Sequence, residues 1–199
     1  MDPTDARNRS RDYLTDAAGV IVAVADECLE DIVSASGILI DSFRSGGALL
    51  ICGNGGSAAD AQHLATEFVS ALTLDRARPA MRAIALTTDS SALTAIANDF
   101  GVERMFARQV EAIGRAGDVL LAISTSGNSP NTLAAAEVAH AQAMRVVALT
   151  GASGGLLAPL ADVAIRVPST TTAHIQESHL AIEQLLALLA ERAIHPDPT

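Results

Sequence analysis

The chain has 199 residues, of which 49% are hydrophobic and 18% charged, and this is enough apolar sequence to bury one sizeable core. Its formal net charge of −10, its lack of tryptophan and its aromatic content of 3% argue against a surface that follows phosphates and stacks bases, so we expect no direct nucleic-acid partner. No apolar run reaches the roughly 18 residues that span a bilayer, and the first residues lack the layout of a signal peptide. We therefore expect a cytoplasmic protein with no membrane partner.

The amino-terminal segment, residues 7–44, has the composition of one or two amphipathic helices. It is longer than a cover for one sheet face needs to be. We predict a helical extension over residues 1–44.

The two cysteines, Cys28 in this extension and Cys52 beyond it, are too few for a disulfide framework, so we expect both to be small core residues with free thiols.

Five apolar runs of strand length follow, each ending in Gly, Ser, Thr or Pro: residues 48–52, 82–86, 119–123, 145–149 and 163–167. Stretches of helical composition lie between and after them: about 57–72, 91–114, 131–143, a short piece near 155–161, and a closing helix over 173–194. Strands that are apolar on both faces and alternate with helices are typical of a parallel sheet covered on both sides. We predict an α/β fold, a doubly wound three-layer αβα sandwich with a five-stranded parallel sheet, formed by residues 45–194 and followed by a tail over 195–199.

Two glycine-containing loops stand out, "CGNGGSAADAQH" after the first strand and "STSGNSPN" after the third. In an open parallel sheet, ligands bind at the carboxyl ends of the strands, and helix N-termini there offer unpaired amide groups. The second loop adds four hydroxyls with no cation: Ser124, Thr125, Ser126 and Ser129. We interpret it as a phosphate cradle. The alternative is a helix cap formed by Asn128 or Ser129 before Pro130, but a cap needs one such residue rather than four.

The first loop is neither a P-loop, because no Lys-Ser/Thr pair follows its glycines, nor the spaced dinucleotide fingerprint. His63 and Glu67 follow it at a spacing of four, so they share one helix face directed at the strand ends. A histidine and a carboxylate at this spacing can bind zinc, and Glu67 is a natural proton carrier. The alternative is an ordinary surface hydrogen bond between the two side chains.

Several longer stretches resemble the sugar isomerase (SIS) domain family, most closely its bacterial phosphoheptose isomerases: "CGNGGSAADAQH", "LTAIANDFG", "GDVLLAISTSGNSPN", "VVALTG" and "RVPSTTTAHIQESH". The similarity runs from about residue 10 to 193. It implies a flavodoxin-like SIS fold and the conversion of sedoheptulose 7-phosphate into an aldoheptose 7-phosphate through an enediol(ate), a step towards nucleotide-activated heptose. It also implies a homotetramer, with the helical extension in its core, active sites at subunit interfaces, and bound zinc.

The resemblance assigns roles residue by residue. The four hydroxyls of the second loop would hold the substrate phosphate, and the sugar would contact Asn54, Gly55, Gly56, Ser57, Asn98, Asp99 and Gln176. The metal ligands would be His63, Glu67 and Gln176, and Glu67 would be catalytic. For Asn98 and Asp99 the alternative is a simple turn.

The chain departs from the family at Gln184, where phosphoheptose isomerases carry a histidine that serves as metal ligand and acid/base. A carboxamide can hydrogen-bond but does not exchange a proton near neutral pH. His179 and Glu183 are on the same helix as candidates to compensate, and Glu183 lies about 20° around the helix from Gln176. The alternative function is a non-catalytic SIS tetramer that binds a phosphosugar or a replication-initiator protein. The SIS tetramers that associate with a replication initiator lack the glutamate that is present here as Glu67.

Overall fold

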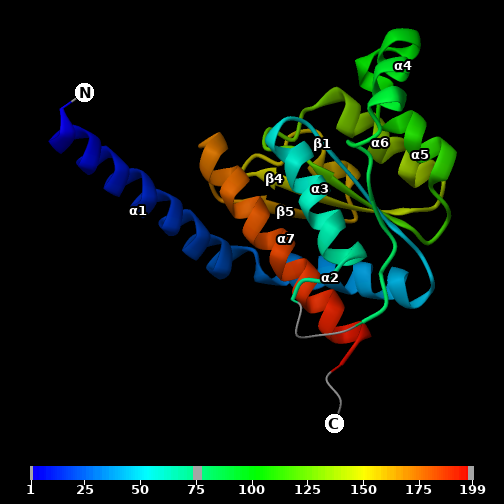
Figure 1. Ribbon diagram of the computed structural model, residues 1–199, viewed down its shortest axis with the longest axis horizontal. Helices are drawn as coiled ribbons and strands as arrows, with labels where there is room; N and C mark the ends of the chain where they lie inside the picture. Colours follow the sequence, from blue (N-terminus) through cyan, green and yellow to red (C-terminus); the bar gives the residue numbers. More distant parts are fainter. Residues whose placement is uncertain (1, 74–77, 197–199) are drawn as a thin grey trace.

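The computed structural model describes residues 2–73 and 78–196 and contains the predicted parallel sheet (Figure 1). Its strands are β1 (Leu49–Gly53), β2 (Ala83–Ala85), β3 (Val119–Ile123), β4 (Arg145–Gly151) and β5 (Val163–Val167). They pair in the order β2-β1-β3-β4-β5, and every pairing is parallel. The predicted fold class is confirmed.

Helices cover both faces of the sheet. They are α1 (Pro3–Glu27), α2 (Leu29–Arg44), α3 (Gly56–Val69), α4 (Ser90–Phe100), α5 (Ala107–Ile113), α6 (Pro130–Ala141) and α7 (Thr172–Ile194), with short turns η1 (Val102–Arg104) and η2 (Ala158–Leu160). One buried cluster joins the sheet to α2, α3 and α7, and a second joins its other face to α5 and α6.

Alternate residues of β1 face opposite sides of the sheet, which explains why this strand is apolar throughout. Leu49 and Ile51 belong to the first cluster, while Leu50 and Cys52 belong to the second. Successive strand side chains point to opposite faces, so a sheet covered on both sides requires apolar residues at every position. Cys52 and Cys28 are both free and buried, as expected.

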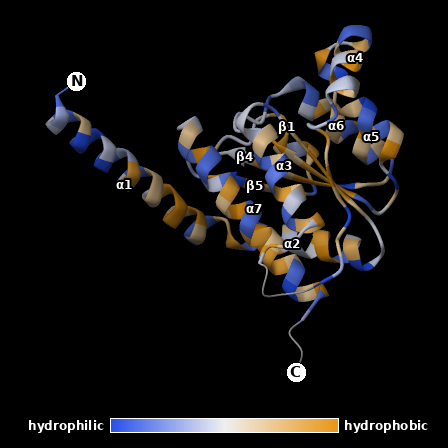
Figure 2. Cartoon of the chain, in the orientation of Figure 1, coloured by the Kyte–Doolittle hydropathy of each residue, from blue (hydrophilic) through white to orange (hydrophobic). Residues whose placement is uncertain are grey.

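Helix α1 projects away from the sheet, and only its carboxyl end meets the core (Figure 1). Val24 is its one buried side chain among the described residues. The apolar colour of α1 lies mainly in its second half, nearer the body of the protein (Figure 2). The apolar side chains exposed along it are Tyr13, Leu14, Ile21 and Val22.

Three predicted helices end differently in the structure. The predicted helix over 91–114 is interrupted at Gly101, whose φ of +91° is rarely accessible to other residues, and it becomes α4, η1 and α5. The helix predicted to reach residue 72 ends at Val69, and the piece near 155–161 contains only the turn η2.

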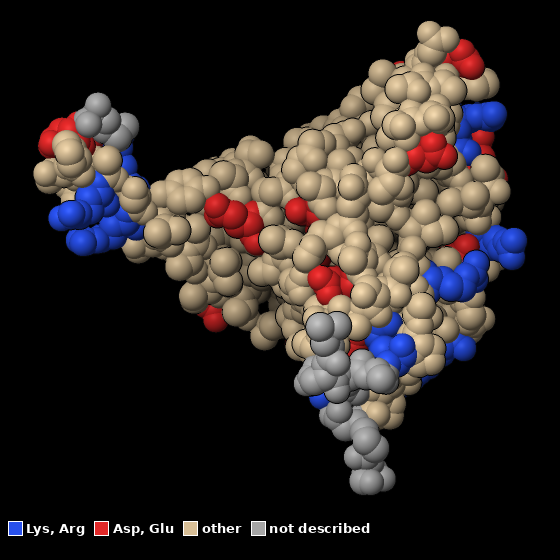
Figure 3. All heavy atoms as spheres, in the orientation of Figure 1, with Lys and Arg blue, Asp and Glu red and all other residues tan. Residues whose placement is uncertain are grey.

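Charged side chains are scattered over the face seen in Figure 3, apart from a basic cluster at the tip of α1, where the sequence contains Arg7, Arg9 and Arg11. Within residues 2–73 and 78–196, no helix is both long enough and apolar enough to cross a membrane.

The order of the strands determines where a ligand can bind. The chain crosses from β1 to β2 through α3 on one face of the sheet and from β3 to β4 through α6 on the other. β1 and β3 are direct neighbours, with Gly53 opposite Ile123 at their carboxyl ends. The loops that follow these two strands therefore diverge from one point, which is the usual ligand position in such sheets.

Buried Asp118 anchors the amino ends of two strands, and this leads to a prediction about stability. Its carboxylate accepts hydrogen bonds from the backbone N–H of Ala48 at 2.8 Å and of Arg115 at 2.9 Å, and the residue is only 2% exposed. Asp118→Ala leaves two N–H groups without acceptors and should lower the free energy of unfolding by about 2–4 kcal/mol in urea titrations.

The matched control is Asp162→Ala. Asp162 accepts a hydrogen bond from Val146 N–H at 2.7 Å, but its side chain is 23% exposed, so water can replace it. We expect a loss of about 1 kcal/mol there. Equal losses in the two variants would contradict the role of burial.

Candidate active site

The loops after β1 and β3 are joined directly at the point where they diverge. Asn54 Nδ2 donates to Asn131 Oδ1 at 2.9 Å, and Asn131 Nδ2 donates back to Asn54 Oδ1 at 2.8 Å. Asn131 is buried in the first turn of α6, whereas Asn54 is exposed. This reciprocal pair holds the loop after β1, which is predicted to contact the sugar and is here called the sugar loop, against the loop after β3, which is predicted to hold the phosphate and is here called the phosphate loop. Sequence reasoning assigned no role to Asn131, although the residue closes the motif "STSGNSPN".

The predicted phosphate cradle is a compact turn of hydroxyls. Ser124 Oγ lies 3.0 Å from Ser129 Oγ and 3.5 Å from Ser126 Oγ, and Ser126 Oγ also accepts from the N–H of Asn128 at 3.1 Å. Gly127 has a φ of +67°, and a Cβ there would come within 2.2 Å of the Gly154 carbonyl oxygen. The glycine therefore allows the turn to pack closely against the segment around Gly154.

A cavity of about 340 Å³ opens beside this turn. It is lined by Thr125, Ser126, Asn128, Gly151, Ala152, Ser153, Ser169, Thr170, Thr172 and Ile175. Hydroxyls from three different loops line it, and it contains no lysine or arginine. The residues contributed by the β4 loop and by the start of α7 were missed by sequence reasoning, although "PSTTT" before α7 is a visible hydroxyl cluster.

A second cavity of about 330 Å³ is lined by Asn54 and Asn131 together with Ser129 and Pro130. Val102 and Glu103 of η1 complete its wall. The predicted sugar-binding residues Asn98 and Asp99 are exposed on α4, where Asn98 Nδ2 donates to Asp99 Oδ1 at 2.7 Å. Within one chain, η1 rather than the Asn98–Asp99 pair lines this cavity.

Helices α3 and α7 lie side by side, and a line of polar contacts, here called the α3–α7 seam, joins them (Figure 1). At its upper end, Ser57 Oγ donates to Gln176 Oε1 at 3.1 Å, and Gln176 Nε2 donates to Asp60 Oδ2. A Cβ on Gly56 would come within 3.0 Å of Gln176 Oε1. The absence of that Cβ lets α7 approach the sugar loop closely.

Further along the seam, His63 Nε2 lies 3.3 Å from Glu67 Oε1, and the carboxamide of Gln184 contacts the same imidazole nitrogen. The side chain of Glu67 is 14% exposed and that of His63 is 46% exposed. Sequence reasoning therefore placed His63 and Glu67 together correctly. Gln184, where the resemblance leads us to expect a histidine, reaches this pair.

The lower end of the seam is held by a buried ion pair. Arg78 Nε lies 2.6 Å from Glu191 Oε2, and both side chains are almost fully buried. The same guanidinium donates to the carbonyl oxygens of Glu67 at 2.6 Å and Phe68 at 2.9 Å, at the end of α3. Arg78 thus ties the last turn of α3 to α7 and fixes the backbone that carries Glu67.

His179 and Glu183 are fully buried and lie beneath the site. His179 Nε2 lies 3.1 Å from the carbonyl oxygen of Thr150, and burial lowers the pKa of the imidazole to about 4. Burial, with a smaller contribution from Asp60, raises the pKa of Glu183 to about 9. Burial also raises the pKa of Asp60 to about 6, against an opposing effect of His63. Near neutral pH, His179 and Glu183 are therefore uncharged.

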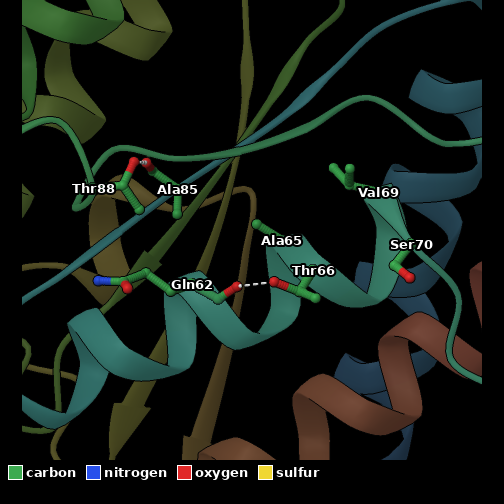
Figure 4. A pocket seen from close by; sticks show the side chains of 7 residues that line it. All are labelled: Gln62, Ala65, Thr66, Val69, Ser70, Ala85 and Thr88. Carbon is green, nitrogen blue, oxygen red and sulfur yellow. Dashed lines mark hydrogen bonds between the residues drawn. The ribbon is translucent and has the colours of Figure 1, made fainter.

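A separate hollow of about 320 Å³ lies between α3 and the segment around β2 (Figure 4). It is lined by Gln62, Ala65, Thr66, Val69, Ser70, Ala85 and Thr88. None of these side chains titrates near neutral pH, so this hollow offers no acid or base for a proton transfer.

The predicted zinc ligands fit an ion in part. Two ligands of one tetrahedral zinc are about 3.4 Å apart for bonds of about 2.1 Å, close to the 3.3 Å between His63 Nε2 and Glu67 Oε1. Gln176 Oε1 instead accepts a hydrogen bond from Ser57. Within the described parts of the chain, no group of three His, Cys, Asp or Glu side chains could hold a metal ion. A third protein ligand would therefore come from another kind of group, such as the carboxamide of Gln176.

Comparison with known proteins agrees with this geometry. The family model of the SIS domain matches residues 12–151. The phosphoheptose isomerase of Rhodospirillum rubrum is 48% identical over 184 residues, which are 92% of this chain and 96% of that protein. The phosphoheptose isomerase of Roseiflexus sp. (strain RS-1) is 52% identical over 177 residues, 89% of this chain and 83% of that protein.

Solved structures give the same result. The phosphoheptose isomerase of Neisseria gonorrhoeae superposes with a TM-score of 0.88 at 40% identity and covers 94% of this chain and 98% of its own. That of Francisella tularensis gives a TM-score of 0.89 at 37% identity and covers 96% of this chain and 100% of its own. The chain therefore belongs to the SIS domain family and, within it, to the phosphoheptose isomerases.

Proposed function

We propose that this chain isomerises sedoheptulose 7-phosphate to an aldoheptose 7-phosphate, and that this product feeds the synthesis of nucleotide-activated heptose. The observation that carries the proposal is the position of the His63–Glu67 pair, on the helix that begins at the sugar loop. A hydroxyl-lined cavity stands at the end of the neighbouring strand. An acid–base pair and an anion site at adjacent strand ends suit an aldose–ketose isomerisation of a sugar phosphate.

The second loop would hold the phosphate through the hydroxyls of Ser124, Thr125, Ser126 and Ser129. Support comes from the hydroxyls of Ser126 and Ser129, which lie 3.5 Å and 3.0 Å from the hydroxyl of Ser124. Charge-assisted hydrogen bonds to a dianion are about twice as strong as neutral ones. No cation is required, which agrees with the lack of lysine and arginine in the cavity lining.

Glu67 would remove the proton from C1 of the ketose, which leaves an enediolate, and would return a proton to C2. The same carboxyl group would carry the proton from the C1 hydroxyl to the C2 oxygen, because His63 Nε2 would be occupied as a metal ligand. Asn54, Gly55, Gly56, Ser57 and Gln176 would contact the sugar. Asn98 and Asp99 are exposed on α4, so their proposed contact would be with a substrate held by a neighbouring subunit.

A zinc ion would be held by His63 and Glu67, with Gln176 as a weaker third ligand. It would supply positive charge to polarise the substrate oxygens.

The alternative, a non-catalytic SIS tetramer that binds a phosphosugar or an initiator protein, is favoured only by the carboxamide at Gln184. We further propose that the protein acts in the cytoplasm, with no membrane or nucleic-acid partner.

The phosphate loop can be tested through the affinity for substrate. Ser126→Ala removes one hydroxyl from the cradle, and the loss of a charge-assisted bond, about 1.5–3 kcal/mol, should weaken sedoheptulose 7-phosphate binding about tenfold or more in calorimetry. Ser45→Ala, which alters an exposed hydroxyl before β1 at the opposite edge of the sheet, is the control and should bind normally. Unchanged affinity in Ser126→Ala would refute the cradle.

Turnover distinguishes the isomerase from the binding module. Glu67→Gln should abolish the conversion of sedoheptulose 7-phosphate, because one placed acid–base group typically contributes about 10²–10⁴-fold. Gln184→His places a second imidazole beside His63, so it should raise kcat and tighten zinc binding. The turnover of both variants is measured by following the aldose product with and without added zinc. A folded wild type and Gln184→His that both lack turnover would favour the binding module.

The proposed homotetramer follows from the exposed surface of α1. This helix of 25 residues has one described buried side chain and touches α7 through Tyr13, which donates to Glu177, and isolated helices are marginally stable in water. Leu14 is 67% exposed and Val22 is 61% exposed, while Val33 on α2 is 59% exposed. Exposed apolar side chains of this extent on neighbouring helices are typical of an interface.

Light scattering should give a mass near four times the chain mass of 20.4 kDa. Val22→Lys adds a charge to the apolar side of α1 and should shift the mass towards smaller species. Leu156→Lys is the matched control, because Leu156 is 65% exposed on a loop far along the chain from α1. A wild type that stays monomeric at micromolar concentration would refute the assembly.

A further inference from the structure

Helix α3 ends close to Glu67 and has no cap of its own at that end. Its last residue is Val69, two positions after Glu67, and Ser70 rather than a glycine follows. The last turn contains no basic residue either. The last four carbonyl groups of a helix lack partners within it, and a helix end frays where no other group pairs them. The position of Glu67 therefore depends on groups from elsewhere in the chain.

Arg78 provides these groups. Its Nη2 donates to the carbonyl oxygen of Glu67 at 2.6 Å, and its Nη1 donates to that of Phe68 at 2.9 Å. The backbone N–H of Met81 also donates to Phe68 at 3.0 Å, whereas the carbonyl oxygen of Glu67 has Arg78 as its donor among the described residues. A cation at a helix carboxyl terminus also interacts favourably with the helix dipole. Arg78 thus caps the turn that carries Glu67.

Glu191 of α7 fixes the direction of this guanidinium. Its Oε2 lies 2.6 Å from Arg78 Nε, and the side chains of Arg78 and Glu191 are only 2% and 3% exposed. A guanidinium is planar, so an acceptor at Nε determines where both Nη groups point. A buried ion pair is often no more stable than two apolar side chains of similar volume. Stability alone therefore does not explain the pair, whereas the match of one guanidinium to three acceptors gives it a geometric role.

We propose that Arg78 and Glu191 are positioning residues for proton transfer by Glu67. Glu191 orients Arg78, and Arg78 fixes the turn from which the Glu67 carboxyl group reaches the site. That carboxyl group lies 3.3 Å from His63 Nε2, so a movement of the turn changes what it reaches. Misplacing a reacting group by about 1 Å can slow a reaction about 10²-fold. Neither Arg78 nor Glu191 touches the substrate, which the loops after β1 and β3 would hold.

This inference rests on the proposed isomerase function, because Glu67 is the proton carrier there. Four measurements separate the two: kcat for sedoheptulose 7-phosphate, calorimetric affinity for the same ligand, the melting temperature, and the hydrogen-exchange rate of the Ser70 amide. The Ser70 N–H donates to the carbonyl oxygen of Thr66 at 2.8 Å and closes the last turn of α3. Its exchange rate therefore reports the opening of that turn and requires no turnover.

The decisive variant combines Arg78→Met with Glu191→Leu. It removes both charges at once, so no buried charge is left unpaired and the melting temperature should fall by little. We expect kcat to fall about tenfold or more, affinity to stay within about threefold of the wild type, and the Ser70 amide to exchange faster. Arg78→Lys keeps the charge but not the planar fork, so it should also lower kcat at unchanged affinity. If the double variant does not fold, Arg78→Lys carries the test.

Leu120→Ala is the control for stability alone. Leu120 is fully buried in the cluster on the other face of the sheet, so this variant should melt earlier than the double variant and keep its kcat. Matched values in the two variants would show that lost stability explains the effect and would overturn the proposal.

A wild-type kcat in the double variant, or an unchanged exchange rate of the Ser70 amide, would also overturn the proposal. A parallel fall of affinity and kcat would do the same, because it indicates a general disturbance of the site rather than a misplaced Glu67. If the wild type shows no turnover, the isomerase proposal fails, and the Ser70 amide still decides whether Arg78 and Glu191 hold this turn.

Discussion

The parallel pairing of β1 with β3 is the constraint on which the rest of the structure depends. Their crossovers leave on opposite faces of the sheet, so the loops after them must diverge from one point. The cavity of about 330 Å³ lies where these two loops meet and is lined by Asn54 and Asn131. The reciprocal hydrogen bonds between Asn54 and Asn131 then join the two loops directly.

The α3–α7 seam is the second determinant of the site, because both helices and Arg78 supply its polar side chains. The Arg78–Glu191 pair closes the lower end, Gln176 and Asp60 close the upper end, and the His63–Glu67 pair lies between them. Buried polar groups of this kind stabilise little by themselves and depend on complete hydrogen bonding. The unpartnered Glu183 is the exception, and a stability cost at such a position is typical of a functional site.

Much of the fold could be predicted because it depends on short-range patterns. A strand buried on both faces must be apolar at each position, and the central strands β1 and β3, which are fully buried, meet this requirement in the sequence. Element ends were less predictable where one backbone position decides them. Gly101 takes a positive φ and divides one expected helix into α4, η1 and α5, a choice that helical composition does not reveal.

For the site, the sequence by itself determined which chemistry is available: the hydroxyls of Ser124, Ser126 and Ser129, and the spacing that puts His63 beside Glu67 on one helix face. Only the tertiary structure decided which distant groups join them. Residues about 120 positions apart in sequence, such as His63 and Gln184, come into contact because α3 and α7 pack on the same face of the sheet. The burial of Glu183 was decided in the same way, because the depth of a side chain depends on what packs over it, which helical periodicity cannot specify.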